Sequence, residues 1–154
     1  MGTRALSDLE QAVKADPANA RLRHLLGAEY AQAGQIESAK AELFHAITLD
    51  PGAHVARFQL GLLLLTMGDS TTAMRVWQSL DSLPERVSVR QFKRGLEGLI
   101  RGDRRLCREA LTEGMAANSE NAPLNDDMRR ILAQLADEPA PVRTDFSLYG
   151  ATRH

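Results

Sequence analysis

The sequence has few of the residues on which several protein classes depend. Cys107 is the single cysteine among 154 residues, so no disulfide bond can form within the chain. Aromatic residues make up 5% of the sequence, while leucine and alanine are abundant, which favours helices over a β-sandwich. The longest apolar run, Leu60 to Leu65, is far too short to span a bilayer. The composition therefore predicts a soluble helical protein of a reducing compartment, and we expect it in the cytoplasm.

An excess of charge of one sign is also missing. The chain has 19 Lys and Arg against 20 Asp and Glu, a net charge of -1. Neither nucleic acid nor an anionic membrane is favoured as a partner by this balance. The first residues are partly acidic where a secretory signal needs an apolar core. We expect no nucleic-acid binding and no membrane insertion.

Sequence motifs of enzymes and metal sites are absent as well. There is no glycine-rich phosphate loop, nucleophile elbow or dinucleotide-binding fingerprint. The histidines, His24, His45, His54 and His154, have no metal-ligand spacing with Cys107 or with a pair of acidic residues. We therefore expect no enzymatic activity, no catalytic residues, no metal and no cofactor.

What the sequence does contain is a period of 34 residues. Four series of residues follow this period: Gly27, Gly61 and Gly95; Gly34, Gly68 and Gly102; Ala5, Ala39, Ala73 and Cys107; Leu9, Leu43, Trp77 and Leu111. Several independent series that share one period indicate a repeat protein.

Each repeat has the pattern of two helices. Apolar residues such as Leu22, Leu26 and Tyr30 are spaced close to 3.6 residues apart. Gly34 stands where the first helix must end, in the left-handed conformation that glycine tolerates. Gly27 lies inside that helix, where a glycine costs about 1 kcal/mol, and we expect it to let a neighbouring helix approach. The predicted helices are near 4–15, 20–33, 36–49, 54–67, 70–81, 86–101, 104–117 and 123–136.

The motifs within the period resemble the tetratricopeptide repeat. The first unit reads Leu26-Gly27-x-x-Tyr30, then Ala39-x-x-x-Leu43 and Pro51, and the second reads Leu60-Gly61-x-x-Leu64 and Ala73-x-x-x-Trp77. The third unit keeps the phase but has Arg94 and Gly98 at the positions of the leucine and the aromatic residue.

The resemblance implies an all-α fold, a right-handed α-solenoid of about eight helices. Its expected domain covers residues 1–136, with repeats near 20–53, 54–87 and 88–121. A half repeat at 4–17 precedes them and a capping helix at 123–136 follows. Residues 137–154 form a proline-containing tail. This tail contains an apolar cluster of Phe146, Leu148 and Tyr149.

The resemblance also implies where a ligand binds, because the first helices of successive repeats line a concave surface in this family. The phase places nine residues on that surface: His24, Ala28, Gln32, Phe58, Leu62, Leu65, Phe92, Leu96 and Leu99. One subgroup of the family clamps a carboxylate with Lys, Arg and Asn at such positions, and their absence here argues against such a clamp. The apolar residues form either a groove for a helix or extended segment of a partner, or part of the core.

We therefore expect a non-enzymatic protein–protein interaction module, an adaptor or chaperone-like protein. Short proteins of this family often serve bacterial secretion, pilus or envelope assemblies. The alternative is a self-assembling scaffold, such as a homodimer, joined through the N-terminal helix with Leu6, Leu9 and Val13 or through the tail. The tail is either disordered or docks on this protein or a neighbouring copy.

Overall fold

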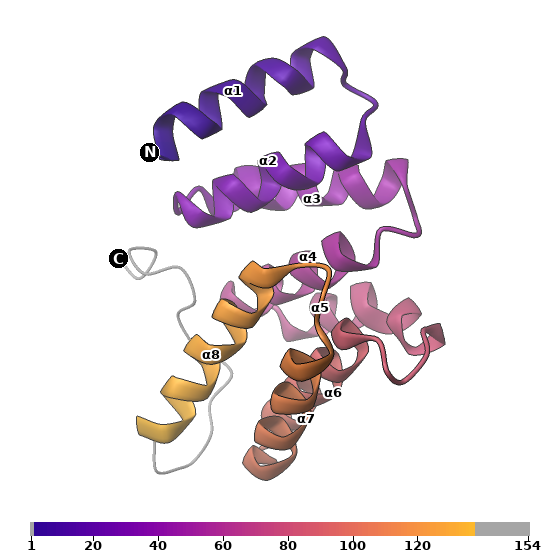
Figure 1. The fold of residues 1–154 in the computed structure, drawn as a ribbon, viewed down its shortest axis with the longest axis vertical. Helices are drawn as coiled ribbons and strands as arrows, with labels where there is room; N and C mark the ends of the chain where they lie inside the picture. Colours follow the sequence, from indigo (N-terminus) through magenta and orange to yellow (C-terminus); the bar gives the residue numbers. More distant parts are fainter. Residues whose placement is uncertain (1, 138–154) are drawn as a thin grey trace.

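The computed structural model describes residues 2–137, and within this range the chain is all-helical, with eight α-helices and no strand (Figure 1). The helices are α1 (Gly2–Ala15), α2 (Ala20–Gln32), α3 (Ile36–Leu49), α4 (His54–Thr66), α5 (Ser70–Trp77), α6 (Ser88–Ile100), α7 (Arg104–Ala117) and α8 (Ala122–Asp137). A 3₁₀ helix, η1 (Gln78–Ser82), follows α5 directly. The predicted all-α fold is thus confirmed.

Three of the predicted glycines end the first helix of each pair. Gly34, Gly68 and Gly102 have φ angles of 80°, 82° and 85°, the left-handed conformation expected for them. After the first of these, the Gln35 N–H donates to the Tyr30 carbonyl at 2.9 Å, and the same bond recurs after the other two. This arrangement satisfies carbonyl groups at the helix end, so the same tight turn closes all three pairs.

The other three glycines bring the two helices of each pair together. A Cβ atom added to Gly27 would lie 2.9 Å from Cγ of Leu43, and one added to Gly95 would lie 3.0 Å from Cδ2 of Leu111. At Gly61 the added atom would lie 2.0 Å from Nε1 of Trp77. The bulky residue of each second helix therefore occupies the space that the glycine leaves, and this is how the glycine lets the neighbouring helix approach.

The middle pair departs from the predicted boundaries. The second helix was expected to reach residue 81, but α5 ends at Trp77 and continues as η1. Pro84 disfavours a helical conformation at the preceding Leu83, which is extended with ψ 153°. The nearby side chain of Lys93 on α6 is buried and bonds to Oδ1 of Asp81 at 2.6 Å, which ties η1 to α6.

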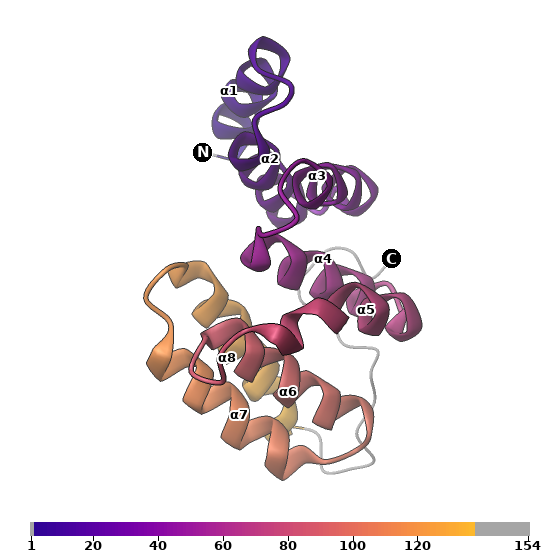
Figure 2. The ribbon, with the colours of Figure 1, turned by 90° about the vertical axis from the view of Figure 1, so that its right-hand side faces the viewer.

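The last helix, α8, completes the core. Leu124, Met128, Ile131 and Leu135 recur at helical spacing and are buried in the same apolar cluster as residues of α4 and α6. Figures 1 and 2 show α8 beside α6 and α7, whereas α1, α2 and α3 form the other end of the molecule. The chain thus folds back over its later repeats.

Candidate functional site

Six of the nine residues predicted to line the groove are in the core. Phe58, Leu62, Leu65, Phe92, Leu96 and Leu99 are each at most 3% exposed. They share one hydrophobic cluster with the buried residues of α8. The expectation that these six form an open groove is therefore wrong for this structure. The reason is physical: an apolar inner face of this size is stabilised by burial, and the apolar side chains of α8 join the same buried cluster.

The aromatic residues in this cluster have a structural role. The ring of Phe58 stacks on Trp77 at 5.4 Å between centroids, and it meets Phe92 at 5.7 Å. The indole N–H of Trp77 donates to the carbonyl oxygen of Phe58 at 3.0 Å. These contacts join α4, α5 and α6 into one packed unit.

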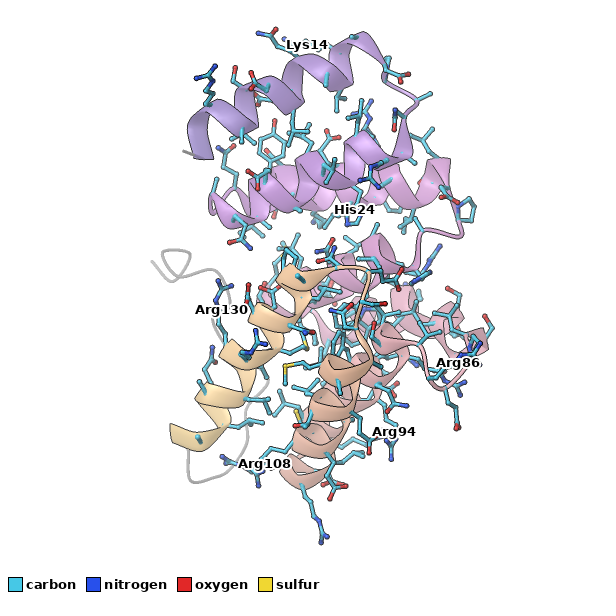
Figure 3. The ribbon with its side chains drawn as sticks, viewed as in Figure 1. Lys14, His24, Arg86, Arg94, Arg108 and Arg130 are labelled. Atoms are coloured by element: carbon cyan, nitrogen blue, oxygen red, sulfur yellow. The ribbon has the colours of Figure 1, made fainter. Side chains whose placement is uncertain are left out.

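The other three predicted residues, His24, Ala28 and Gln32, line an open cavity of about 480 Å³. Its apolar floor includes Leu25, a leucine that is 40% exposed. The cavity lies between the first helices of the chain and the N-terminal half of α8, and Figure 3 shows His24 on α2 and Arg130 on α8 at its two sides. The remaining lining residues are Ala5, Leu9, Glu29, Ala31, Leu43, Gln59, Asn121, Pro123, Asp126 and Asp127.

A second cavity, of about 500 Å³, continues the first along α2. The two share four lining residues, His24, Leu25, Asn121 and Pro123. At the far end, Nε2 of His54 lies 2.9 Å from Oε1 of Glu120, which links the start of α4 to the segment before α8. Together the cavities form an elongated groove, which we call the α2–α8 groove.

Two polar groups, the half-buried His24 and the buried Asp127, shape the electrostatics of the α2–α8 groove. Burial lowers the pKa of His24, and a hydrogen bond with Gln59 partly opposes this shift. Burial also raises the pKa of Asp127 to about 6, against the attraction of Arg130, whose Nη1 lies 3.0 Å from Oδ1 of Asp127. The wall formed by α8 is therefore polar, in contrast to the apolar floor.

The α2–α8 groove has the form of a binding surface. Among residues 2–137 no three His, Cys, Asp or Glu side chains gather in a way that could hold a metal ion. Cys107 lies outside the groove, and burial raises the pKa of its thiol to about 12, which suppresses the reactive thiolate. What remains is a concave surface with an apolar floor and a polar rim, which is typical of ligand sites.

Reasoning from the sequence missed the α8 side of this groove. Asn121, Pro123, Asp127 and Arg130 lie on or just before α8, which was expected only to cap the end of the solenoid. The available signal was the apolar stripe of that helix together with the apolar inner positions of the second and third repeats. Two apolar faces in one small chain usually bury each other.

Two segments were predicted to dock, the N-terminal helix and the C-terminal tail, and the structure describes only the helix. Val13 was expected on an unpartnered face of the N-terminal helix, but it is buried, and it lines a hollow with Leu26 and Tyr30 of α2. Tyr30 Oη also donates to Glu10 Oε2 at 2.6 Å, so this face of α1 contacts α2. The tail cluster of Phe146, Leu148 and Tyr149 lies outside the described residues.

Comparison with known proteins adds to this picture. A tetratricopeptide repeat family model matches residues 2–74, which extend from α1 into α5. A search of curated proteins found no match to the chain. No helix in the described part is long and apolar enough to cross a membrane. Residues 2–74 are therefore similar to the tetratricopeptide repeat family, and the paired glycines repeat the same helix-pair geometry in α6 and α7, beyond the matched residues.

Proposed function

We propose that this protein is a non-enzymatic interaction module that binds a segment of a partner protein in the α2–α8 groove. The observation that carries the proposal is the open groove itself, with the exposed Leu25 on its floor. Tetratricopeptide repeat domains bind protein partners, and the concave side of the first complete repeat is the part of the predicted surface that α8 leaves open.

The dimensions favour an extended segment over a helix. The inner residues of the later repeats are buried in one cluster with α8, and each open cavity is about 500 Å³ or smaller. Pockets of roughly 300–1,000 Å³ hold small ligands or a few side chains. A partner segment that places apolar side chains on Leu25 and Ala28, and polar groups toward α8, matches this surface. An adaptor or chaperone-like role in a bacterial secretion, pilus or envelope assembly is part of the proposal.

The test fills the groove with one side chain. Ala28→Arg places a long cation on the floor, while Ala41→Arg places the same residue on the exposed side of α3 and serves as the matched control. Each variant and the wild type are used to capture proteins from the cells that produce the chain. We expect at least one protein that wild type and Ala41→Arg retain and that Ala28→Arg loses. If Ala28→Arg is folded by circular dichroism and captures the same proteins as the wild type, the groove is not the site.

The alternative role, self-assembly through α1, has less support. No large hydrophobic side chain is exposed on the described part of α1, and Val13 faces α2. Specific protein interfaces usually bury apolar side chains at their centre. We therefore favour partner binding over the scaffold.

A further inference from the structure

The floor of the α2–α8 groove is an apolar surface that the described residues leave uncovered. It is formed by Ala5 and Leu9 from α1 and by Leu25 and Ala28 from α2. Leu25 is one of the few large hydrophobic side chains that are exposed in residues 2–137. An apolar surface at the bottom of a groove is stabilised when another apolar segment covers it.

The same inner face of the later repeats is covered by the chain itself. The position that His24 has in the first repeat is taken by Phe58 in the second and Phe92 in the third, and both are buried in the cluster that contains α8. The chain therefore uses its C-terminal part to fill its concave side. Beyond α8 it continues with residues 138–154, which contain the apolar cluster of Phe146, Leu148 and Tyr149.

The spacing within that cluster suits the floor. Phe146 and Leu148 are two residues apart, so in an extended segment their side chains point to the same side, about 7 Å apart. Pro139 and Pro141 oppose continuation of the helix and favour an extended chain after α8. An extended segment is also what the dimensions of the groove admit.

The tail is long enough to reach the groove. It starts at the C-terminal end of α8, a helix of 16 residues that is about 24 Å long. The residues of α8 that line the groove, up to Arg130, lie in its first nine residues. Phe146 lies nine positions after Asp137, which corresponds to about 30 Å of extended chain. The tail can therefore return along α8 and place Phe146 on the floor.

We propose that the C-terminal tail docks in the α2–α8 groove of its own chain, with Phe146 and Leu148 against Leu9, Leu25 and Ala28. The tail then occupies the surface assigned above to a partner, and in this respect the inference rests on the proposed function. A partner must displace the tail before it binds. The occupant is a segment of this chain, and docking within one molecule does not depend on protein concentration.

Docking within one molecule needs only weak affinity. A short flexible connection gives an effective concentration on the order of 1 mM. A segment whose dissociation constant is about 50 µM in free solution would then be bound in about 95% of molecules.

The test compares full-length chains by methyl NMR. One variant carries Phe146→Ser and Leu148→Ser, and the matched control carries Ala140→Ser and Ala151→Ser in the same tail. We expect the methyl signals of the groove floor to shift in the first variant and to stay in place in the control. The signals of Val76 on α5, which is not part of the groove, should be unchanged in both.

A second measurement tests the same contact from outside. A synthetic peptide of residues 142–154 is added to the full-length Phe146→Ser/Leu148→Ser variant, whose own tail no longer competes. We expect the floor signals to return to their wild-type positions with a dissociation constant of about 10–100 µM. The same peptide with both serine substitutions should have no effect.

Several results would overturn the inference. Floor signals that are identical in the wild type and the serine variant, with no response to the peptide, show that the tail does not dock. Floor signals that change on dilution of the wild type, together with a dimer mass by light scattering, show that the tail docks on a neighbouring copy.

The tail inference and the proposed function can also fail independently of each other. If Ala28→Arg loses a partner but the serine variant leaves the floor signals unchanged, only the tail inference is wrong. If the tail docks but Ala28→Arg loses no partner, only the proposed function is wrong.

Discussion

Replacing Gly61 with alanine tests how the two helices of the middle repeat fit together. The new Cβ would lie 2.0 Å from Nε1 and 2.3 Å from Cε2 of Trp77, far inside contact distance. The indole cannot easily move aside, because it is fully buried, stacks on Phe58 and donates a hydrogen bond to the Phe58 carbonyl. One methyl group therefore forces the helices apart or displaces the ring.

The expected change in the free energy of unfolding of Gly61→Ala is the sum of three contributions. Alanine is favoured over glycine inside a helix by about 1 kcal/mol, which stabilises the variant. Overpacking costs about 1–3 kcal/mol, and this clash belongs at the upper end. Loss of the indole hydrogen bond adds about 1 kcal/mol. We expect Gly61→Ala to lower the free energy of unfolding by about 2–4 kcal/mol.

The third repeat supplies the matched control. A Cβ on Gly95 would lie 3.0 Å from Cδ2 of Leu111 and 3.2 Å from both the Ala110 Cβ and the Cys107 carbonyl oxygen, which is much milder crowding than at Gly61. Gly95→Ala should therefore stay within about 1 kcal/mol of the wild type, since helix propensity offsets the crowding. Urea unfolding followed by circular dichroism measures both variants.

A double-mutant cycle isolates the contact. Trp77→Leu gives the middle repeat the same glycine–leucine pair as its neighbours, so Gly61→Ala should cost less than about 1 kcal/mol in that background. If Gly61→Ala costs the same with Trp77 and with leucine at position 77, the ring is not what the glycine accommodates. The same conclusion follows if the single variant is as stable as the wild type.

Three further predictions concern single side chains. Trp77→Ala should cost roughly 3–5 kcal/mol, and a melting temperature within about two degrees of wild type would contradict its core position. The pKa of Asp127 is raised to about 6 in the folded protein, so its protonation stabilises the fold below about pH 4 and this stabilisation is lost as the pH rises through 6. Asp127→Asn should therefore be more stable than wild type by about 1–3 kcal/mol at pH 8, and urea titrations should show this gain disappearing near pH 4. The Cys107 thiol, buried and with a pKa of about 12, should react with a thiol reagent only as fast as the protein opens; rapid reaction of the native protein would refute its burial.

Most of the repeat architecture could be predicted from the sequence because its cause is local. Gly34 must adopt a positive φ, and Gly27 must admit Leu43, wherever the chain has these residues in this order. The early end of α5 was harder to predict. It depends on Pro84 and on contacts such as that between Lys93 and Asp81, which join segments with no common periodicity.

The candidate site was predicted only in part because it depends on how distant helices meet. The phase of the repeat placed His24, Ala28 and Gln32 on the inner surface, and in the structure these three residues line the α2–α8 groove. It could not reveal that Phe58 and Phe92 are buried in one cluster with α8, because an amphipathic helix has the same pattern whether it caps the end of a solenoid or packs on its inner face. Choosing between these positions requires the three-dimensional arrangement.

The position of α8 has a consequence for how the protein is made. During synthesis, α2 to α7 leave the ribosome before α8 does, so the inner faces of α4 and α6 emerge without the helix that buries them. Until α8 follows, side chains such as Leu62 and Leu96 remain accessible to chaperones and to other nascent chains. A copy that stops short of α8 keeps this apolar surface exposed, which marks it for degradation by the quality-control machinery of the cell.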